Sequence, residues 1–256
     1  MQPIFSKIIK YSCALIHIVF WSQLAAKESN WIALFNGKDL TNWTPKFAGK
    51  PLGENYLNTF QVKDGKLIVS YENWSHFNNE FGHLFYAVPY SNYVLRATYR
   101  FVGEQVRNGP DWAYRNNGFM LHSQPPESMT LEQGFPTSIE VQLLGGNGKD
   151  KRATGNLCTP ETSIVMGGKR VHEHCIDSKS KTYHGDQWVN VEIEVRGSAY
   201  VKHKINGVVV MEYSGLQKDN GTVLSHGYIA IQAESHGTEF KRIELLPLNT
   251  KYLENE

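Results

Sequence analysis

The chain has 256 residues, of which 41% are hydrophobic and 12% aromatic, and its formal net charge at pH 7 is +1. This length is sufficient for one large hydrophobic core. The balanced charge, without a basic stripe, argues against a nucleic-acid partner, because phosphate binding depends on clustered lysine and arginine. Aromatic enrichment suits a sugar-binding surface as well as an ordinary β-sandwich core, so composition leaves the function open.

The first 26 residues have the arrangement of a secretory signal peptide. Two lysines precede an apolar run from Tyr11 to Trp21, and Leu24-Ala25-Ala26 follows as a cleavage site. The run is too short to span a bilayer, and no other segment approaches that length. We therefore predict a signal peptide at 1–26, one domain at 27–256, and no membrane span in the mature chain. The expected location is the bacterial periplasm or the extracellular medium.

Short strands and turn signals are predicted along the rest of the chain. The clearest hairpin lies between Thr59 and Tyr71 with Asp64-Gly65 at its turn, and a second hairpin surrounds Asn206-Gly207. Long irregular stretches are expected around these strands. Further strands are expected at 32–35, 83–87, 93–102, 118–122, 138–144, 188–196, 227–234 and 238–246, and irregular stretches at 45–58, 104–117 and 145–185.

No stretch of ten or more residues shows an apolar period of 3.6, so no helix is predicted. Many short strands with closely spaced turns predict an all-β fold, a β-sandwich or jelly roll. The last two strands are expected to pair with each other through the turn Ser235-His236-Gly237.

Two cysteines remain after removal of the signal peptide, Cys158 and Cys175. In an oxidising compartment these two residues, both flanked by loop residues, are predicted to form a disulfide. The alternative is a pair of free buried thiols. Together with His172 and His174 they could also suggest zinc, but their spacing fits no common structural zinc pattern.

Polar side chains alternate with apolar ones on several predicted strands. Ile139, Val141 and Leu143 share one face of their strand, which leaves Glu140 and Gln142 on the other. If the strands are neighbours in one curved sheet, six polar side chains converge on its concave face: Glu140, Gln142, His122, Gln232, Glu234 and His236. Each of them alone could belong to a solvated or structural strand face. Together they need partners such as the hydroxyl groups of a sugar, and the carboxyl and imidazole groups could act as acid and base.

Retaining glucanases with a jelly-roll fold carry Glu-x-Asp-x-x-Glu along one strand, which places two carboxylates about 5 Å apart. The comparable run here is Glu140-Val141-Gln142-Leu143-Leu144-Gly145, which lacks the second and third acids. A double-displacement hydrolysis by this strand is therefore disfavoured.

Several segments resemble the 3-keto-disaccharide hydrolase family, found in many secreted bacterial proteins. The segment 32–43, Ile-Ala-Leu-Phe-Asn-Gly-Lys-Asp-Leu-Thr-Asn-Trp, is similar to the opening motif of that family. The likeness continues, in the right order, through residues 60–67, 116–122, 138–144, 206–207 and 231–236. The resemblance implies a concanavalin A-like jelly-roll β-sandwich of two antiparallel sheets that acts on an oligosaccharide or glycoside whose C3 carries a ketone.

A C3 ketone acidifies the C2 proton, so the chemistry implied by the resemblance is removal of that proton, elimination of the C1 substituent and addition of water. We expect Glu140 or His236 to be the base, and the other or Glu234 to be the acid. The expected substrate-binding side chains are Gln142, Gln232, His122, Arg115 and Trp112. A divalent metal ion could also stabilise the enolate, although the sequence shows no certain cofactor site.

The alternative function is a non-catalytic, lectin-like carbohydrate-binding module, because jelly rolls serve both purposes. A perturbed acid–base pair in the cleft would favour the enzyme, and a planar row of exposed aromatic side chains would favour the binding module. A structural export protein without a ligand is a third reading, which leaves the polar strand faces unexplained.

Overall fold

The computed structural model describes residues 30–248, and those from Ile32 onward belong to one unit. The predicted signal peptide lies outside the described residues, and the domain boundary after residue 26 stays a prediction. In the described part, helical structure is limited to three 3₁₀ turns: η1 (Tyr56–Asn58), η2 (Asp111–Ala113) and η3 (Pro126–Ser128). Between residues 30 and 248, no helix has the length and apolar character needed to cross a membrane.

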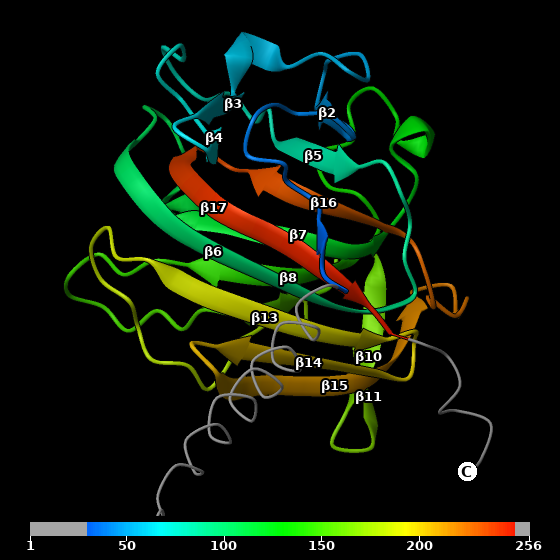
Figure 1. Ribbon diagram of the computed structural model, residues 1–256. Coiled ribbons are helices and arrows are strands. Elements are labelled where there is room, and N and C mark those ends of the chain that lie inside the picture. Colours follow the sequence, from blue (N-terminus) through cyan, green and yellow to red (C-terminus); the bar gives the residue numbers. More distant parts are fainter. Residues whose placement is uncertain (1–29, 249–256) are drawn as a thin grey trace, which may run out of the picture. The chain divides into compact units, whose positions relative to one another are not determined.

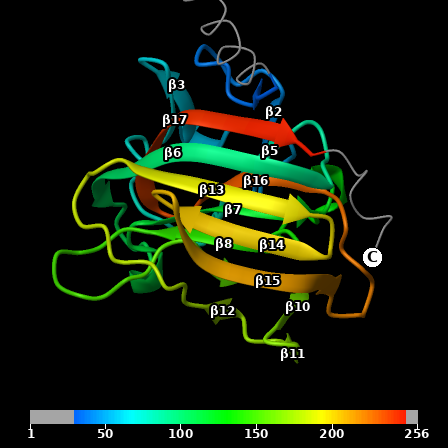
Figure 2. The ribbon, with the colours of Figure 1, turned by 60° about the horizontal axis from the view of Figure 1, so that its bottom comes forward.

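The strands form two antiparallel sheets packed face to face (Figure 1), which confirms the predicted jelly-roll β-sandwich. The larger sheet has ten strands in the order β11-β10-β15-β14-β13-β6-β17-β4-β3, with β1 paired to β17. Figure 2 shows β17, β6, β13, β14 and β15 side by side in this order. The strands are β1 (Ile32–Ala33), β3 (Phe60–Lys63), β4 (Lys66–Val69), β6 (Asn92–Gln105), β10 (Thr162–Met166), β11 (Lys169–Val171), β13 (Val189–Arg196), β14 (Tyr200–Ile205), β15 (Val208–Lys218) and β17 (His236–Pro247).

The smaller sheet has seven strands in the order β12-β9-β8-β7-β16-β5-β2. They are β2 (Trp43–Phe47), β5 (Gly82–Tyr86), β7 (Asn116–Ser123), β8 (Ile139–Leu144), β9 (Asn156–Cys158), β12 (Cys175–Ile176) and β16 (Tyr228–Ala233). This sheet carries most of the polar side chains singled out in the sequence.

Both faces of the seven-stranded sheet are covered at its centre. On the inner face, Ile139, Val141 and Leu143 are fully buried in the main core between the sheets. On the outer face, Met120, Phe85 and neighbouring apolar residues form a second, smaller cluster. Glu140 and Gln232 on this outer face are therefore buried too, and the charged form of the carboxyl group is disfavoured, whereas Gln142 is half-buried.

The two predicted hairpins have the turns that their sequences indicate. Asp64 and Gly65 have φ values of 52° and 70°, and Asn206 and Gly207 have 48° and 82°. Two consecutive residues with positive φ define a type I′ turn, whose twist matches that of the flanking strands. These turns fix the registers of β3 with β4 and of β14 with β15.

The predicted pairing of the last two strands is wrong. β16 lies in the seven-stranded sheet between β5 and β7, whereas β17 lies in the ten-stranded sheet beside β6 and β4. The chain crosses from one sheet to the other at Ser235, which has a φ of 92°. The expected irregular stretches also contain most of β2 and all of β9 to β12, which are too short to show a clear alternation.

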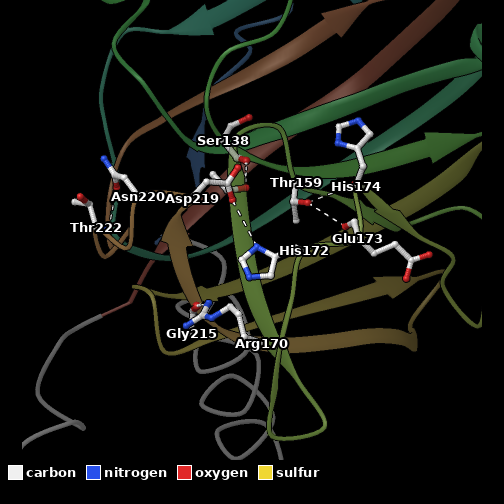
Figure 3. A network of polar contacts seen from close by, with 11 residues as sticks. Ser138, Thr159, Arg170, His172, Glu173, His174, Gly215, Asp219, Asn220 and Thr222 are labelled. Atoms are coloured by element: carbon white, nitrogen blue, oxygen red, sulfur yellow. Dashed lines mark hydrogen bonds and ion pairs between the residues drawn. The ribbon is translucent and has the colours of Figure 1, made fainter.

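The predicted disulfide between Cys158 and Cys175 is present and joins directly opposed residues of β9 and β12. The nearby histidines do not approach it as ligands. His172 is directed at Asp219, with 3.9 Å between Nδ1 and Oδ1, and the His174 ring points elsewhere (Figure 3). Throughout residues 30–248, no three side chains of His, Cys, Asp or Glu gather in a way that could hold a metal ion.

Candidate active site

Three adjacent strands bring four of the predicted site residues to the outer face of the smaller sheet. β7 pairs with β8 so that Met120 lies opposite Glu140 and Gly118 opposite Gln142. On the other side of β7, the register with β16 places Gln232 beside Gly118, and Glu234 continues the same face toward the end of the sheet. Gly118 therefore lies between two glutamines, with Glu140 in the next row.

The missing side chain at Gly118 is what allows its neighbours to meet. A Cβ atom at this position would lie 2.6 Å from Gln232 Oε1 and 3.0 Å from Glu140 Oε1. Atoms of two neighbouring strands thus converge in the space above one glycine. The result is a small polar niche on a face that is otherwise covered by apolar side chains.

The two carboxyl groups of this niche have strongly perturbed acidities. Burial raises the pKa of Glu140 to about 7, although the nearby Gln232 amide partly opposes the shift. Burial, and then the negative charge of Glu140, raise the pKa of Glu234 well above its ordinary value. Because each charge disfavours the other, the pair holds one proton near neutral pH, with Glu140 ionising first.

Several buried polar atoms in this region have no hydrogen-bond partner in the protein. They include both polar atoms of the Gln232 and Asn116 amides and Oε2 of Glu234. All three side chains are at most 2% exposed. An unsatisfied buried polar group costs about 1–3 kcal/mol, which indicates that a ligand or water completes these hydrogen bonds. Asn116 did not figure in the sequence-based set, although it shares the strand parity of Gly118 and Met120.

His83 is a second residue of this region that is not among those predicted from the sequence. It lies opposite Gln232 on β5, is fully buried, and neither ring nitrogen has a partner. Burial, and next the charge of Lys46, lower the pKa of His83 to about 3, so the imidazole is neutral. Lys46 itself donates hydrogen bonds from Nζ to the carbonyl oxygens of Phe47 (2.7 Å) and Leu131 (2.9 Å).

Aromatic side chains cover His83 and lead to the surface. The Phe135 ring lies 5.7 Å from the His83 ring and 4.8 Å from Phe81. Phe81 in turn stacks on Trp112, with ring centroids 5.7 Å apart. Trp112, on η2, is 53% exposed. An exposed indole at the rim of a polar niche is a suitable platform for a sugar ring.

The His122 side chain does not lie with the four polar side chains on the outer face of the smaller sheet, contrary to the prediction from strand parity. Its φ is 47°, and the register between β7 and β16 shifts at this point. The ring lies 6.3 Å from Tyr93, a residue of the inter-sheet core, and Nδ1 is 3.1 Å from the Leu224 carbonyl oxygen. The bulge has turned the side chain from the outer face toward the interior.

His236 and Arg115 lie together, but at the end of the sandwich rather than in the row. The His236 ring packs edge-on against Tyr114 at 5.0 Å and Phe101 at 6.0 Å. Burial, and next the charge of Arg115, lower the pKa of His236 to about 4. Arg115 donates hydrogen bonds to the Gly185 carbonyl oxygen and to Asp186. The crossover at Ser235 explains why strand parity fails for His236.

Because the niche exists only without a side chain at position 118, we expect Gly118→Ala to lower turnover by up to roughly 10²-fold, the usual cost of misplacing catalytic groups. The added methyl group must displace Gln232 and Glu140. Steady-state kinetics measure the effect. Gly134→Ala is the matched control, since its Cβ would meet only Phe81 at 3.6 Å, an ordinary contact. Equal activity of the two variants would contradict the assignment.

Comparisons with known proteins agree with this architecture. The family model of the 3-keto-alpha-glucoside-1,2-lyase-like domain matches residues 30–246. No curated protein is similar enough in sequence to count as a match.

Among solved structures, a proposed glycosyl hydrolase from Parabacteroides distasonis is 18% identical, with a TM-score of 0.56 over 88% of this chain and 97% of that chain. A second such protein from the same organism is 16% identical, with a TM-score of 0.53 over 85% and 99% of the two chains. A β-glucanase from Bacillus licheniformis is 11% identical, with a TM-score of 0.49 over 85% and 97%. At 18% and 16% identity, the similarity to the two Parabacteroides distasonis proteins concerns the fold.

Proposed function

The chain belongs to the 3-keto-alpha-glucoside-1,2-lyase-like family, and from this premise we propose that it cleaves the glycosidic bond of 3-keto-glycosides by elimination followed by hydration. The family is one of carbohydrate-active, glycosyl hydrolase-like proteins. What carries the proposal for this chain is the pair of buried carboxyl groups, Glu140 and Glu234, whose pKa values are both raised. A pair whose two acidities are pushed apart supplies one base and one acid near neutral pH.

In the proposed reaction, ionised Glu140 removes the proton from C2 of the sugar. The electrons of the C2–H bond form a C1–C2 double bond, conjugated with the C3 ketone, by way of an enolate. The C1–oxygen bond breaks, and the departing oxygen takes a proton from Glu234. Water then adds across the double bond, with OH at C1 and H at C2, which completes net hydrolysis.

The neutral amides of the niche suit the charge that develops on the C3 oxygen. Gln232, next to Gly118, and Asn116, two residues before Gly118 on β7, each have amide N–H groups without a hydrogen-bond partner. Donors that are fixed and desolvated before the reaction stabilise an enolate more effectively than mobile water does. Gln142, whose Oε1 accepts a 3.2 Å hydrogen bond from Asn156, has its amide N–H groups left for a sugar hydroxyl.

The test is turnover of a chromogenic 3-keto-glucoside beside its unoxidised parent. We expect release of the chromophore from the keto compound alone, because only the ketone makes the C2 proton acidic enough to remove. A transient species absorbing as a conjugated enone would report the elimination step directly. Cleavage of the unoxidised parent at a similar rate would overturn the keto mechanism and point to ordinary glycoside hydrolysis.

A carbohydrate-binding module without catalytic activity is the second candidate, and the exposed Trp112 is the observation that favours it. Binding of sugars by calorimetry, with no turnover of either chromogenic compound, would establish that function instead. A binding module would also tolerate Glu140→Gln and Glu234→Gln without loss of the activity that defines it.

We also propose that the protein works in the periplasm or outside the cell. The Cys158–Cys175 disulfide supports this location, because such bonds persist mainly in oxidising compartments. Fractionation of producing cells, with the N-terminal sequence of the exported chain, tests both the location and the cleavage after Ala26.

A further inference from the structure

We propose that a pocket at the end of the sandwich, beside His236, is a second sugar subsite that holds the leaving-group sugar of a disaccharide. This inference rests on the proposed function, since the niche around Glu140 and Glu234 would hold the oxidised sugar. The pocket has a volume of about 520 Å³, within the range of small-molecule sites. Its lining is polar and consists of Gln105, Asp111, Tyr114, Asn147, Asp150 and Arg152.

Two residues that line the pocket are linked to residues of the niche, one by a hydrogen bond and one by its position in the chain. Gln105 Nε2 donates 2.9 Å hydrogen bonds to Ser235 Oγ and to the Pro110 carbonyl oxygen. Ser235 directly follows Glu234. Tyr114, which also lines the pocket, lies two residues before Asn116, the first residue of β7. These contacts place one wall of the pocket beside the end of β16, which is why the second ring of a disaccharide is assigned to this pocket.

Buried polar atoms without hydrogen-bond partners lie in the pocket wall at Arg152 and, next to the Tyr114 ring, at Arg115 and His236. Nε of Arg152, Nε of Arg115 and both ring nitrogens of His236 have no hydrogen-bond partner. Arg152 is held in place by the hydrogen bond that its Nη2 donates to the Tyr114 carbonyl oxygen, at 2.7 Å. The Tyr114 ring is the common neighbour, with the two guanidinium groups 5.8 and 6.0 Å and the imidazole 5.0 Å from its centroid.

The balance of charge selects the kind of ligand. Arg152 faces the pocket together with Asp111 and Asp150, and Asp150 also accepts a 2.6 Å hydrogen bond from Asn147. An anionic ligand would meet two carboxylates. A neutral polyol can accept from the guanidinium group, donate to the carboxylates and pack one face on the tyrosine. A hexose, rather than a phosphate or a sugar acid, fits this set.

The experiment compares two 3-keto substrates that differ only in the leaving group, a disaccharide and a methyl glycoside. We expect Arg152→Gln to lower kcat/KM for the disaccharide at least tenfold more than for the methyl glycoside, mainly through KM. Asp111→Ala is the second variant, because Asp111 is exposed and its removal is expected to leave the fold intact. Arg242→Gln, on the ten-stranded sheet, is the matched control and should change neither substrate.

The outcomes separate the subsite from the catalytic proposal. If the wild type cleaves both substrates and neither pocket variant changes their ratio, the subsite is overturned while the proposed function stands. If the wild type cleaves neither, the proposed function fails. Calorimetry with the unoxidised disaccharide then decides: a loss of affinity of at least tenfold in Arg152→Gln supports the subsite, and equal affinities overturn it.

Discussion

Replacing Glu140 by glutamine is expected to lower kcat on a 3-keto-glycoside by roughly 10²–10⁴-fold, the usual contribution of a positioned general base. The amide keeps the size of the side chain and its place above Gly118, but it cannot accept the C2 proton. Since the substrate still binds, KM should change much less than kcat. Single-turnover kinetics with saturating enzyme would show the loss in the chemical step.

The control for this variant is Glu192→Gln. Glu192 lies on β13 of the other sheet and pairs with Lys204 at 2.7 Å, far from the niche by topology. It should leave turnover unchanged. Circular dichroism and thermal melting of both variants would establish that the sandwich is intact. If Glu140→Gln retained nearly full turnover, another group would have to be the base, and the reaction scheme would need to be redrawn.

The sequence predicts well which face of its strand each site residue occupies. Alternation of apolar residues places Glu140 with Gln142, and Gln232 with Glu234, and the fold makes their strands neighbours of β7. Parity is a local property, so it holds as long as the backbone remains regularly extended. Both hairpins are predicted for a similar reason, because their turn signals lie within a few residues. The disulfide is predicted differently, because only two cysteines remain after the predicted signal peptide.

Parity fails where the backbone leaves the extended conformation. His122 and Ser235 both have positive φ values, at 47° and 92°. Neither residue is a glycine, so the sequence contains no signal for this backbone conformation. The first turns His122 into the interior, and the second carries His236 into the other sheet. For Asn116 and His83 the parity is correct, but nothing else in the sequence marks them as site residues, because no carboxyl group or repeated polar pattern accompanies them. Only the registers of β7 with β8 and of β5 with β16 reveal their place.

The carboxyl pair should also destabilise the protein in a pH-dependent way, and we expect Glu140→Gln to be more stable than the wild type at pH 8 by on the order of 3 kcal/mol. Folding raises the pKa of Glu140 from 4.5 to about 7. Below about pH 4.5 the group is protonated in both states and costs nothing. As the pH rises toward 7 the unfolded chain ionises first, so the wild type loses stability, and above 7 the loss is constant.

The measurement is the difference in unfolding free energy between wild type and variant, by urea titration from pH 4.5 to 8.5. The difference cancels the contributions of His83 and His236, whose lowered pKa values make stability rise with pH over part of this range. Glu239→Gln is the contrasting control. Burial alone would raise the pKa of Glu239, but hydrogen bonds from Arg100 and Lys66 lower it.

The Glu239 variant should therefore be less stable than the wild type at neutral pH, with a difference that disappears only below about pH 4.5. A Glu140→Gln difference that stayed constant from pH 4.5 to 8.5 would contradict the raised acidity on which the acid–base assignment depends. A carboxyl group that weakens the fold at neutral pH contributes nothing to the sandwich as a structure, and glutamine, of the same size, would pack there at a lower cost. The presence of a glutamate rather than a glutamine at position 140 is then explained by chemistry, since reactive groups at active sites commonly lower the stability of the fold.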